Sequence, residues 1–360
     1  MRVRVYPADQ WGCGHYRLIW PGQALVDQGH DVTVILPGEG SGIGGVVMNG
    51  RLEGIAMSDE EDADVYVFQR PSNIMSLDLI RRLRGRGKTV VVDMDDDLSC
   101  IHPRNAAFTS LHPRYSPRNN WQIAVQGCRE ASLVTVSTPP LLDRYSRFNN
   151  ARVLRNCIPR RFLDLEHVDD GQPIWGWAGA LVSHPDDLPM LGATVAEMNR
   201  LGFEFQIIGS LDGTGHSLGL RQDPAGPGAV PFGEYTDHLT KFQLGVAPLN
   251  DTKFNRSKSW LKPLEYAACG IPWIASARPE YSELARRGGG IVVGDKSKNW
   301  TAAVKRLLTN DAARIEAGQA ARAVASEFTI EEHAWRWLET WDVAHRLDQG
   351  MPIEGATILT

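Results

Sequence analysis

Two successive series of short apolar runs and helical stretches limit the folds open to this chain. The first series predicts strands at 3–6, 32–36, 65–68, 89–92 and 133–136, with helices near 17–29, 77–86, 121–129 and 140–148. Strands that alternate with helices in this way predict an α/β unit built on a parallel, doubly wound sheet.

A second series follows a polar, acidic stretch at 162–173 that has no apolar periodicity. It predicts strands at 174–178, 203–208, 229–232, 244–247, 273–275 and 290–293, with helices near 185–200, 257–269, 298–308 and 311–328. Two Rossmann-like domains in series are expected to face each other across a cleft at the carboxyl ends of their strands. We place them at 1–162 and 173–328, joined by a linker at 163–172.

The segment 329–360 is expected to form a helix that crosses back to the first domain, followed by a loose tail. Thr329 and Glu332 have the spacing of a capping box, and the tryptophans Trp335, Trp337 and Trp341 are expected to pack rather than bind ligand. Ser183 and Asp186 have the same capping-box spacing before the predicted helix at 185–200.

Composition and charge exclude several classes of protein. The chain has 360 residues, of which 42% are hydrophobic and 22% charged, and its formal net charge is -5. Such a chain is globular and has no basic field for nucleic acid. The five cysteines are scattered, which fits neither a disulfide framework nor a zinc site and indicates a reducing, cytoplasmic location. We expect no transmembrane segment, and peripheral contact with a membrane stays open.

The segment 254–272 carries the clearest chemical pattern. On a helix running through 257–269, Lys258, Lys262 and Glu265 would share one face, apart from an apolar stripe. Lysines beside a helix N-terminus suit a diphosphate, and a carboxylate about 10 Å further along suits the hydroxyls of a ribose. An ordinary surface helix with paired charges is the alternative interpretation.

This segment resembles the donor site of retaining GT-B glycosyltransferases of family 4, including phage and bacterial members with an F-N-x-x-K-S-x-x-K-x-x-E-Y pattern. Glu265 matches the second glutamate of the family's E-x7-E motif, whereas Ser257 stands at the position of the first. The resemblance implies that nucleotide-binding residues include Asn255, Lys258, Ser259, Lys262 and Glu265.

Other segments resemble the same family along nearly the whole chain. A glycine loop after the first strand contains Gly12 and Gly14, although these glycines taken alone favour a plain tight turn. The second domain offers Gly179, Ser183 and His184 after its first strand, and Gly209 with Ser210 after its second. The resemblance implies donor binding by these residues, with His184 also catalytic.

The acidic run Asp93, Met94, Asp95, Asp96 and Asp97 follows a strand of the first domain. It could be a D-x-D metal motif, or a helix cap with solvated carboxylates. The resemblance favours a third interpretation, in which the run lines the acceptor pocket without a metal. It implies catalytic roles for Asp95 and for His102 on the following loop. The residues expected on the acceptor side are His15, Tyr16, Arg17, Asp93 and Asp96.

We therefore predict a metal-independent, retaining glycosyltransferase, a hexosyltransferase, that transfers sugar from a nucleotide-diphosphate donor to a glycan, glycolipid or protein. The donor is a substrate, so no cofactor is expected, and UDP and GDP are not distinguished. A sugar-nucleotide epimerase or hydrolase of the same fold is one alternative. A non-catalytic nucleotide- or glycan-binding protein is another, which Ser257 keeps open.

Overall fold

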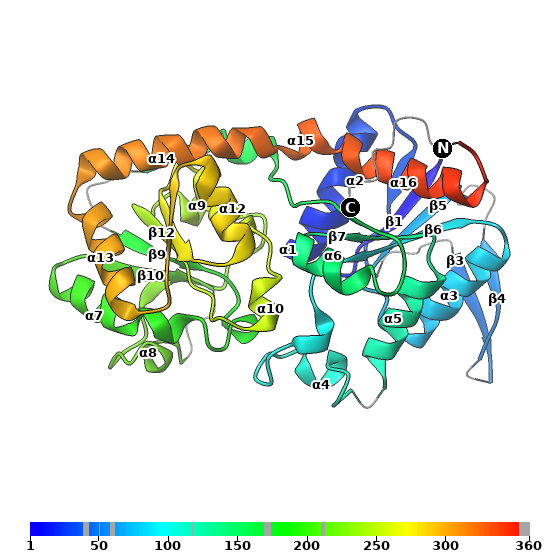
Figure 1. Ribbon diagram of the computed structural model, residues 1–360, viewed down its shortest axis with the longest axis horizontal. Helices are drawn as coiled ribbons and strands as arrows, with labels where there is room; N and C mark the ends of the chain where they lie inside the picture. Colours follow the sequence, from blue (N-terminus) through cyan, green and yellow to red (C-terminus); the bar gives the residue numbers. More distant parts are fainter. Residues whose placement is uncertain are drawn as a thin grey trace. The chain divides into compact units, whose positions relative to one another are not determined.

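The computed structural model describes residues 1–38, 43–49, 51–57, 62–116, 118–168, 174–209 and 213–352 (Figure 1). Its contacts divide the chain into two units. The first unit comprises Met1–Ile101, Ala107–Asn156 and Ile330–Thr360, and the second comprises His102–Ala106 and Cys157–Thr329. The chain therefore enters the second unit twice, once for the short segment His102–Ala106.

The first unit is built on a six-stranded parallel sheet. Its strands lie in the order β2 (Val32–Val34), β1 (Val3–Tyr6), β5 (Val65–Gln69), β6 (Thr89–Met94), β7 (Leu133–Val136) and β8 (Ala151–Val153). Strands β5 and β6 are buried along their whole length, as expected for parallel strands covered on both faces. The short edge strand β8 was not predicted from the sequence.

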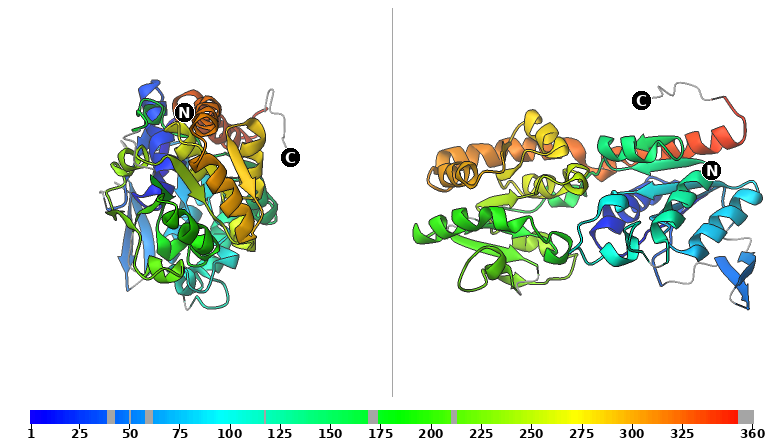
Figure 2. Two further views of the ribbon diagram at one scale, coloured as in Figure 1. Left: turned by 90° about the vertical axis from the view of Figure 1, so that its left-hand side faces the viewer. Right: turned by 60° about the horizontal axis from the view of Figure 1, so that its bottom comes forward.

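Helices cover this sheet on both faces. The helices and turns of this unit are α1 (Gly12–Gly14), the π-helix His15–Ile19, α2 (Trp20–Asp27), α3 (Ile74–Gly85), a 3-10 turn (Leu98–Cys100), α4 (Phe108–Leu111), α5 (Asn120–Glu130), α6 (Pro139–Tyr145), α15 (Ile330–His333) and α16 (Trp335–Asp348). A hairpin of β3 (Ile43–Met48) and β4 (Arg51–Met57) stands out from the unit beside α3 (Figure 2). This hairpin was not predicted from the sequence.

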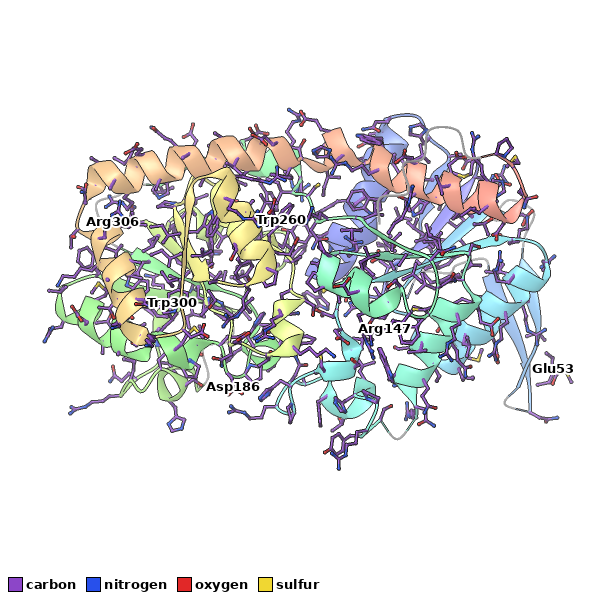
Figure 3. The ribbon with its side chains drawn as sticks, in the orientation of Figure 1. Glu53, Arg147, Asp186, Trp260, Trp300 and Arg306 are labelled. Atoms are coloured by element: carbon purple, nitrogen blue, oxygen red, sulfur yellow. The ribbon has the colours of Figure 1, made fainter. Side chains whose placement is uncertain are left out.

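The second unit repeats the architecture. Its parallel sheet has the order β11 (Ala225–Gly228), β10 (Glu204–Ile208), β9 (Ile174–Ala178), β12 (Leu244–Ala247), β13 (Trp273–Ser276) and β14 (Gly290–Val293). Trp175, Trp177 and Trp300 lie in one apolar core between the sheet and its helices, and Trp300 on α13 (Ser297–Leu308) is labelled in Figure 3.

The remaining helices of this unit are mostly short. They are α7 (Gly192–Arg200), α8 (Thr214–Ser217), α9 (Tyr235–Leu239), α10 (Lys253–Arg256), α11 (Leu261–Ala268), α12 (Pro279–Arg287) and α14 (Asp311–Ala325), with 3-10 turns at Arg160–Phe162, Leu181–Ser183, Leu188–Leu191 and Ser326–Phe328. In the described ranges, no helix combines the length and the apolar character that crossing a bilayer requires. The predicted fold class, two doubly wound parallel-sheet domains, is confirmed.

Two predicted elements of the second unit are wrong. The strand expected at 229–232 lies instead at β11, where Gly226 takes a φ of 154° and a Cβ would lie 1.9 Å from Ile207 O. Glycine lets this strand approach β10 closely, and no apolar run marks it. The helix expected from 185 begins only at Gly192, after a 3-10 turn. Ser183 therefore does not cap it.

The chain segments that join the units differ in detail from the sequence-based boundaries. The second segment of the first unit, Ala107–Asn156, ends before the predicted boundary at 162, because 157–168 belongs to the second unit. There the Arg322 guanidinium donates to Leu163 O and Leu165 O, and His167 Nε2 lies 2.9 Å from Phe242 O. Residues 169–172 of the predicted linker lie outside the described residues.

The C-terminal helix α16 lies in the first unit, beside β6 and α2 (Figure 1). Trp337 and Trp341 are fully buried, whereas Trp335 is half exposed. The Trp337 Nε1 group donates to Arg17 O at 2.8 Å. The Thr329 hydroxyl is buried and, among the described residues, makes no hydrogen bond, so the predicted capping box is wrong.

Candidate functional site

A proline breaks the lysine-bearing helix that the sequence analysis expected. The segment forms α10, a turn and then α11, which begins at Leu261. Pro263 lacks an N–H, and its ring would clash with the carbonyl of residue 259 in a continuous helix, whereas the first turn of α11 accepts it. Lys258 and Ser259 therefore lie in the turn. The prediction that Lys258 shares a helix face with Lys262 is wrong.

Helix α11 places Lys262 at the carboxyl end of β9. Lys262 Nζ donates to Ala178 O and lies 4.9 Å from the centre of the Trp177 ring. In this sheet β9 pairs with β10 on one side and β12 on the other, so the strand order reverses between β9 and β12. Ligands of open α/β sheets bind at such a reversal. Burial lowers the Lys262 pKa to about 8.

Glycine at 179 makes room for this lysine. Gly179 has a φ of 158°, and a Cβ there would lie 2.9 Å from Lys262 Nζ. Gly209 at the end of β10 has a φ of 146°, and a Cβ there would lie 2.1 Å from Gly179 O. Both glycines allow close approach of backbone at the sheet edge. Ser210 lies outside the described residues.

Lys258 belongs to the same electrostatic environment despite the break in the helix. Its Nζ lies 4.4 Å from the centre of the Phe254 ring. The positive charges of Lys262 and Lys258 both contribute to lowering the pKa of His184, although burial is the main cause. The fold therefore brings two lysines and a histidine within electrostatic range of one another.

His184 is held by a carboxylate that the sequence analysis did not single out. His184 Nδ1 lies 2.8 Å from Asp187 Oδ2. The other oxygen of Asp187 accepts from Asn250 N and from Asn255 Nδ2, both at 2.8 Å. A partner on Nδ1 fixes the orientation of the ring and leaves Nε2 for a ligand. The buried Asn255 amide is used within the protein, so its geometry supports a positioning role rather than the predicted direct donor contact.

Glu265 lies further along α11 and is also held by a residue that the sequence analysis missed. Tyr235 donates its hydroxyl hydrogen to Glu265 Oε1. The Tyr235 ring stacks on Phe232 with centroids 5.4 Å apart. The hydrogen bond from Tyr235 fixes the orientation of this charged, buried acceptor. Nothing in the local sequence links Tyr235 to Glu265, because the two residues are 30 positions apart.

Ser257 and Ser183 play local structural roles. The Ser257 hydroxyl donates to Phe254 O at 2.7 Å, and the residue is 5% exposed. Ser183 ends a 3-10 turn, and its carbonyl accepts from Asn105 Nδ2 at 3.2 Å. The structure therefore offers no carboxylate at position 257 in place of the absent glutamate.

The segment His102–Ala106 lies against the loop that carries His184. His102 Nε2 lies 2.6 Å from Asp186 Oδ2, Arg104 forms an ion pair with the same carboxylate, and Ala106 N donates to Val182 O. Burial and the positive charge of Arg104 lower the His102 pKa. Asp186, labelled in Figure 3, thus holds this segment instead of forming the predicted capping box.

Three of the four aspartates in the acidic run of the first unit pair with arginines. Asp93 pairs with Arg17, Asp95 with Arg70, and Asp97 with Arg144. Asp97 also caps the 3-10 turn at Leu98–Cys100, whereas Asp93 is fully buried. The interpretation of the run as solvated carboxylates is therefore wrong. Within the part of the chain that the structure describes, no group of three or more His, Cys, Asp or Glu side chains could hold a metal ion.

Three of the residues predicted on the acceptor side are buried in the first unit. Arg17, in the π-helix, donates to both oxygens of Asp93 at 3.0 and 2.7 Å, to Asn156 Oδ1 at 2.9 Å and to Leu154 O. Tyr16 is 1% exposed. Direct contact of these side chains with an acceptor is not supported, because the core covers them. His15 and Asp96 are only half-buried.

In the glycine loop, close packing explains why position 14 is a glycine. A Cβ on Gly14 would lie 1.8 Å from Asp9 O, and Asp9 Oδ1 accepts from Gly14 N and Trp11 N, both at 3.0 Å. Gly12 begins the short helix α1. Gly14 is therefore required by the turn itself, which is the alternative that the sequence analysis left open.

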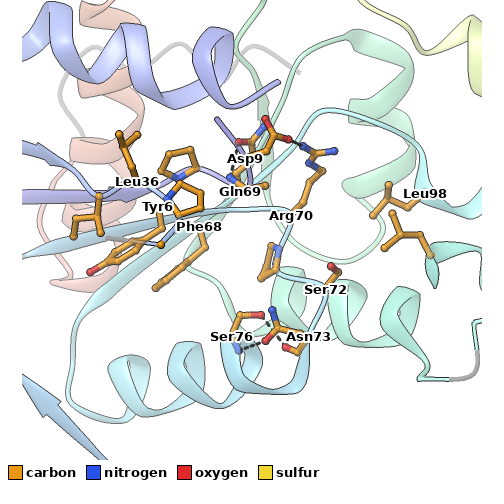
Figure 4. A pocket seen from close by; sticks show the side chains of 17 residues that line it. Tyr6, Asp9, Leu36, Phe68, Gln69, Arg70, Ser72, Asn73, Ser76 and Leu98 are labelled. Carbon is orange, nitrogen blue, oxygen red and sulfur yellow. Dashed lines mark hydrogen bonds and ion pairs between the residues drawn. The ribbon is translucent and has the colours of Figure 1, made fainter. Parts of the chain in front are cut away.

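A cavity at the carboxyl ends of β1 and β5 was not predicted. Its volume is about 550 Å³, within the usual range for small-molecule sites. Tyr6 and Phe68 form one side, and Asp9 and Arg70 another (Figure 4). The sequence signal was weak, because these residues come from loops and strand ends far apart in the chain.

Two doubly wound parallel-sheet domains in series, with polar side chains at the carboxyl edges of both sheets, define the GT-B fold. Residues 192–339 match the model of a family described as glycosyl transferase-like. No curated protein sequence matches this chain.

Solved structures of the same fold cover nearly the whole chain. Sucrose-phosphate synthase from Thermosynechococcus elongatus has a TM-score of 0.69 at 14% identity, over 95% of this chain and 98% of that chain. HepE from Anabaena in complex with UDP-glucose has a TM-score of 0.65 at 14% identity, over 95% and 100%. A glycosyltransferase from Rickettsia africae has a TM-score of 0.63 at 12% identity, over 95% and 98%.

Proposed function

We propose that this chain is a glycosyltransferase that uses a nucleotide-diphosphate sugar as donor. The observation that carries the proposal is the position of Lys262 at the strand-order reversal of the second sheet, with His184 and Glu265 at the same edge. The family match over 192–339 and the fold shared with a structure in complex with UDP-glucose support it.

The geometry supports a division of labour at the donor. Lys262 and Lys258 stabilise the negative charge that develops on the leaving diphosphate, because preorganised cations in a partly desolvated site oppose that charge effectively. Glu265, held by Tyr235, binds the ribose hydroxyls. His184, oriented by Asp187, presents Nε2 to the diphosphate or the sugar.

The finer features of the proposal are retention of anomeric configuration, hexosyl transfer and independence from metals. Retention and hexosyl transfer rest on the family resemblance. Metal independence is supported by the arginine partners of Asp93, Asp95 and Asp97, which already provide positive charge beside these three carboxylates. The five free cysteines support a reducing, cytoplasmic location.

Ligand binding and turnover test the proposal in two stages. Thermal unfolding with UDP, GDP, ADP and their sugars identifies the donor, because a ligand at about 100 times its Kd stabilises by roughly 2.7 kcal/mol. Mass spectrometry then follows sugar transfer to a panel of glycans, with and without EDTA. Transfer that survives EDTA is expected.

Other outcomes identify the alternatives. Donor consumption at the same rate without any acceptor indicates a hydrolase or epimerase. Tight donor binding without consumption indicates a binding protein. Loss of transfer on chelation, with rescue by manganese, would contradict metal independence.

A further inference from the structure

The cavity of the first unit lies where ligands of this kind of sheet are expected. Strand β1 pairs with β2 on one side and with β5 on the other, so the strand order reverses between β1 and β5. Tyr6 ends β1 and Gln69 ends β5, and both line the cavity. The carboxyl ends of strands at such a reversal form a natural crevice.

One side of the cavity is apolar and flat. The rings of Tyr6 and Phe68 stack with centroids 4.7 Å apart and an interplanar angle of 15°. Leu36, two residues after the end of the neighbouring strand β2, lines the same side (Figure 4). Such a surface packs against the C–H face of a ring-shaped ligand and removes it from water.

The opposite side holds a fixed hydrogen-bond donor. Arg70 has a φ of 46°, which is rare for a residue with a side chain. Its Nη2 contacts Asp9 Oδ2 at 2.5 Å and its Nε contacts Asp95 Oδ1 at 3.1 Å. Its Nη1 group has no hydrogen-bond partner among the residues that the structure describes. A guanidinium held in this way can donate to a ligand without losing further conformational freedom.

The charge around Arg70 is negative overall. Asp9 and Asp95 both pair with the guanidinium of Arg70. The side chains are 27% exposed for Asp9, 7% for Asp95 and 19% for Arg70. Asp96 acts on the same arginine through space. An anionic ligand would therefore meet an excess of negative charge in a partly desolvated site, whereas a neutral ligand would not.

We propose that this cavity binds the acceptor, and that the part of the acceptor it takes is an uncharged, polyhydroxylated ring such as a neutral glycosyl residue. The ring places its C–H face on Tyr6 and Phe68 and its hydroxyls toward Arg70 and Asp9. The inference rests on the proposed function and narrows the acceptor to a glycan end without phosphate or carboxylate.

Binding of small probes tests the charge selectivity directly. Methyl α-glucoside, methyl α-galactoside and methyl α-mannoside are compared with glucuronate and glucose 6-phosphate by saturation-transfer NMR, up to about 50 mM. At least one neutral glycoside is expected to bind about tenfold or more tightly than either anion. Asp9→Asn retains an acceptor oxygen for Trp11 N and Gly14 N but removes one negative charge from the cavity. This variant is therefore expected to reduce the difference in affinity between the neutral glycosides and the anions.

A cavity-filling variant tests the location. Leu36→Trp is expected to abolish glycoside binding, whereas Leu201→Trp, at a position 44% exposed in the second unit, leaves it unchanged. Thermal unfolding checks that both variants fold. Equal or tighter binding of the anions, no binding of any neutral glycoside, or binding that survives Leu36→Trp would overturn the proposal. Nucleotide binding, measured on the same samples, tests the proposed function separately.

Discussion

The carboxylate of Asp187 joins His184 to the segment around α10, with an Nδ1–Oδ2 distance of 2.8 Å to the histidine and contacts of 2.8 Å to Asn250 N and Asn255 Nδ2. The histidine is therefore positioned by a residue that is itself fixed by two further hydrogen bonds. This relationship explains why Asn255 can be important for the site without touching a ligand.

Asp187→Asn tests this arrangement. The variant keeps the size of the side chain but loses the charge that orients the His184 ring, so kcat should fall by about 10- to 100-fold while KM for the donor changes less. Steady-state kinetics of sugar transfer measure both constants. If Asp187→Asn lowers kcat by the same factor in a His184→Ala background, the two residues act independently, and the positioning role is wrong.

Proton uptake tests the diphosphate role of Lys262. Because burial lowers its pKa to about 8, part of the lysine is neutral in the free protein above that pH, and a bound diphosphate should restore its charge. Nucleotide-diphosphate binding at about pH 8.5 should therefore take up protons, since the terminal phosphate, with a pKa of about 6, is already ionised. Calorimetry in two buffers of different ionisation enthalpy measures the uptake.

Two lysine variants provide the matched comparison. Lys262→Met should lose the uptake and bind the diphosphate much more weakly than the nucleoside, whereas Lys258→Met should keep the uptake. Identical enthalpies in both buffers for the wild type would refute the assignment. The lowered pKa of Lys262 also predicts how this residue affects stability. Between about pH 8 and the ordinary lysine pKa of 10.5, Lys262 is protonated in the unfolded chain and largely neutral in the folded protein. Its contribution to the free energy of unfolding therefore rises with pH over this range.

Glu265→Gln tests ribose binding. The variant keeps one acceptor but loses the charge, so a ribonucleotide should bind about tenfold or more weakly while the fold is retained. Tyr235→Phe, which removes the hydroxyl that holds Glu265, should weaken the same ligand by a smaller factor. A 2′-deoxy nucleotide should be affected less by either change. Equal discrimination between ribo- and deoxyribonucleotides in wild type and Glu265→Gln would show that Glu265 is structural.

Breaking the buried Arg17–Asp93 pair should destabilise the protein. Arg17→Met leaves the fully buried carboxylate of Asp93 without its bidentate partner, which costs about 3–5 kcal/mol in comparable pairs. Replacing Arg346, which pairs with Asp342 on the surface of the same unit, should cost less than about 1 kcal/mol. Denaturant unfolding compares the two variants, and similar losses would contradict the role assigned to the buried pair.

The sequence by itself determined the two α/β series, the parallel sheets and most strand and helix positions. It did so because apolar period and strand–helix alternation are local properties of the chain, set by which faces must be buried. It also predicted that Lys262 and Glu265 lie on one helix, because their spacing along the chain fits helical geometry. Pro263 is the residue in the sequence that indicates a break before that helix. The spacing of the charged residues suggested one continuous helix instead.

The tertiary structure alone decided which side chains meet across long stretches of sequence. Asp93 and Arg17 are 76 residues apart, and packing around β6 turns an apparently exposed acidic residue into a buried ion pair. Asp187 accepts a hydrogen bond from Asn255, which lies 68 positions further along the chain. The cavity between Tyr6 and Arg70 is lined by residues from several loops. Such contacts depend on the order of strands in the sheet and on burial, neither of which a local pattern of residues specifies.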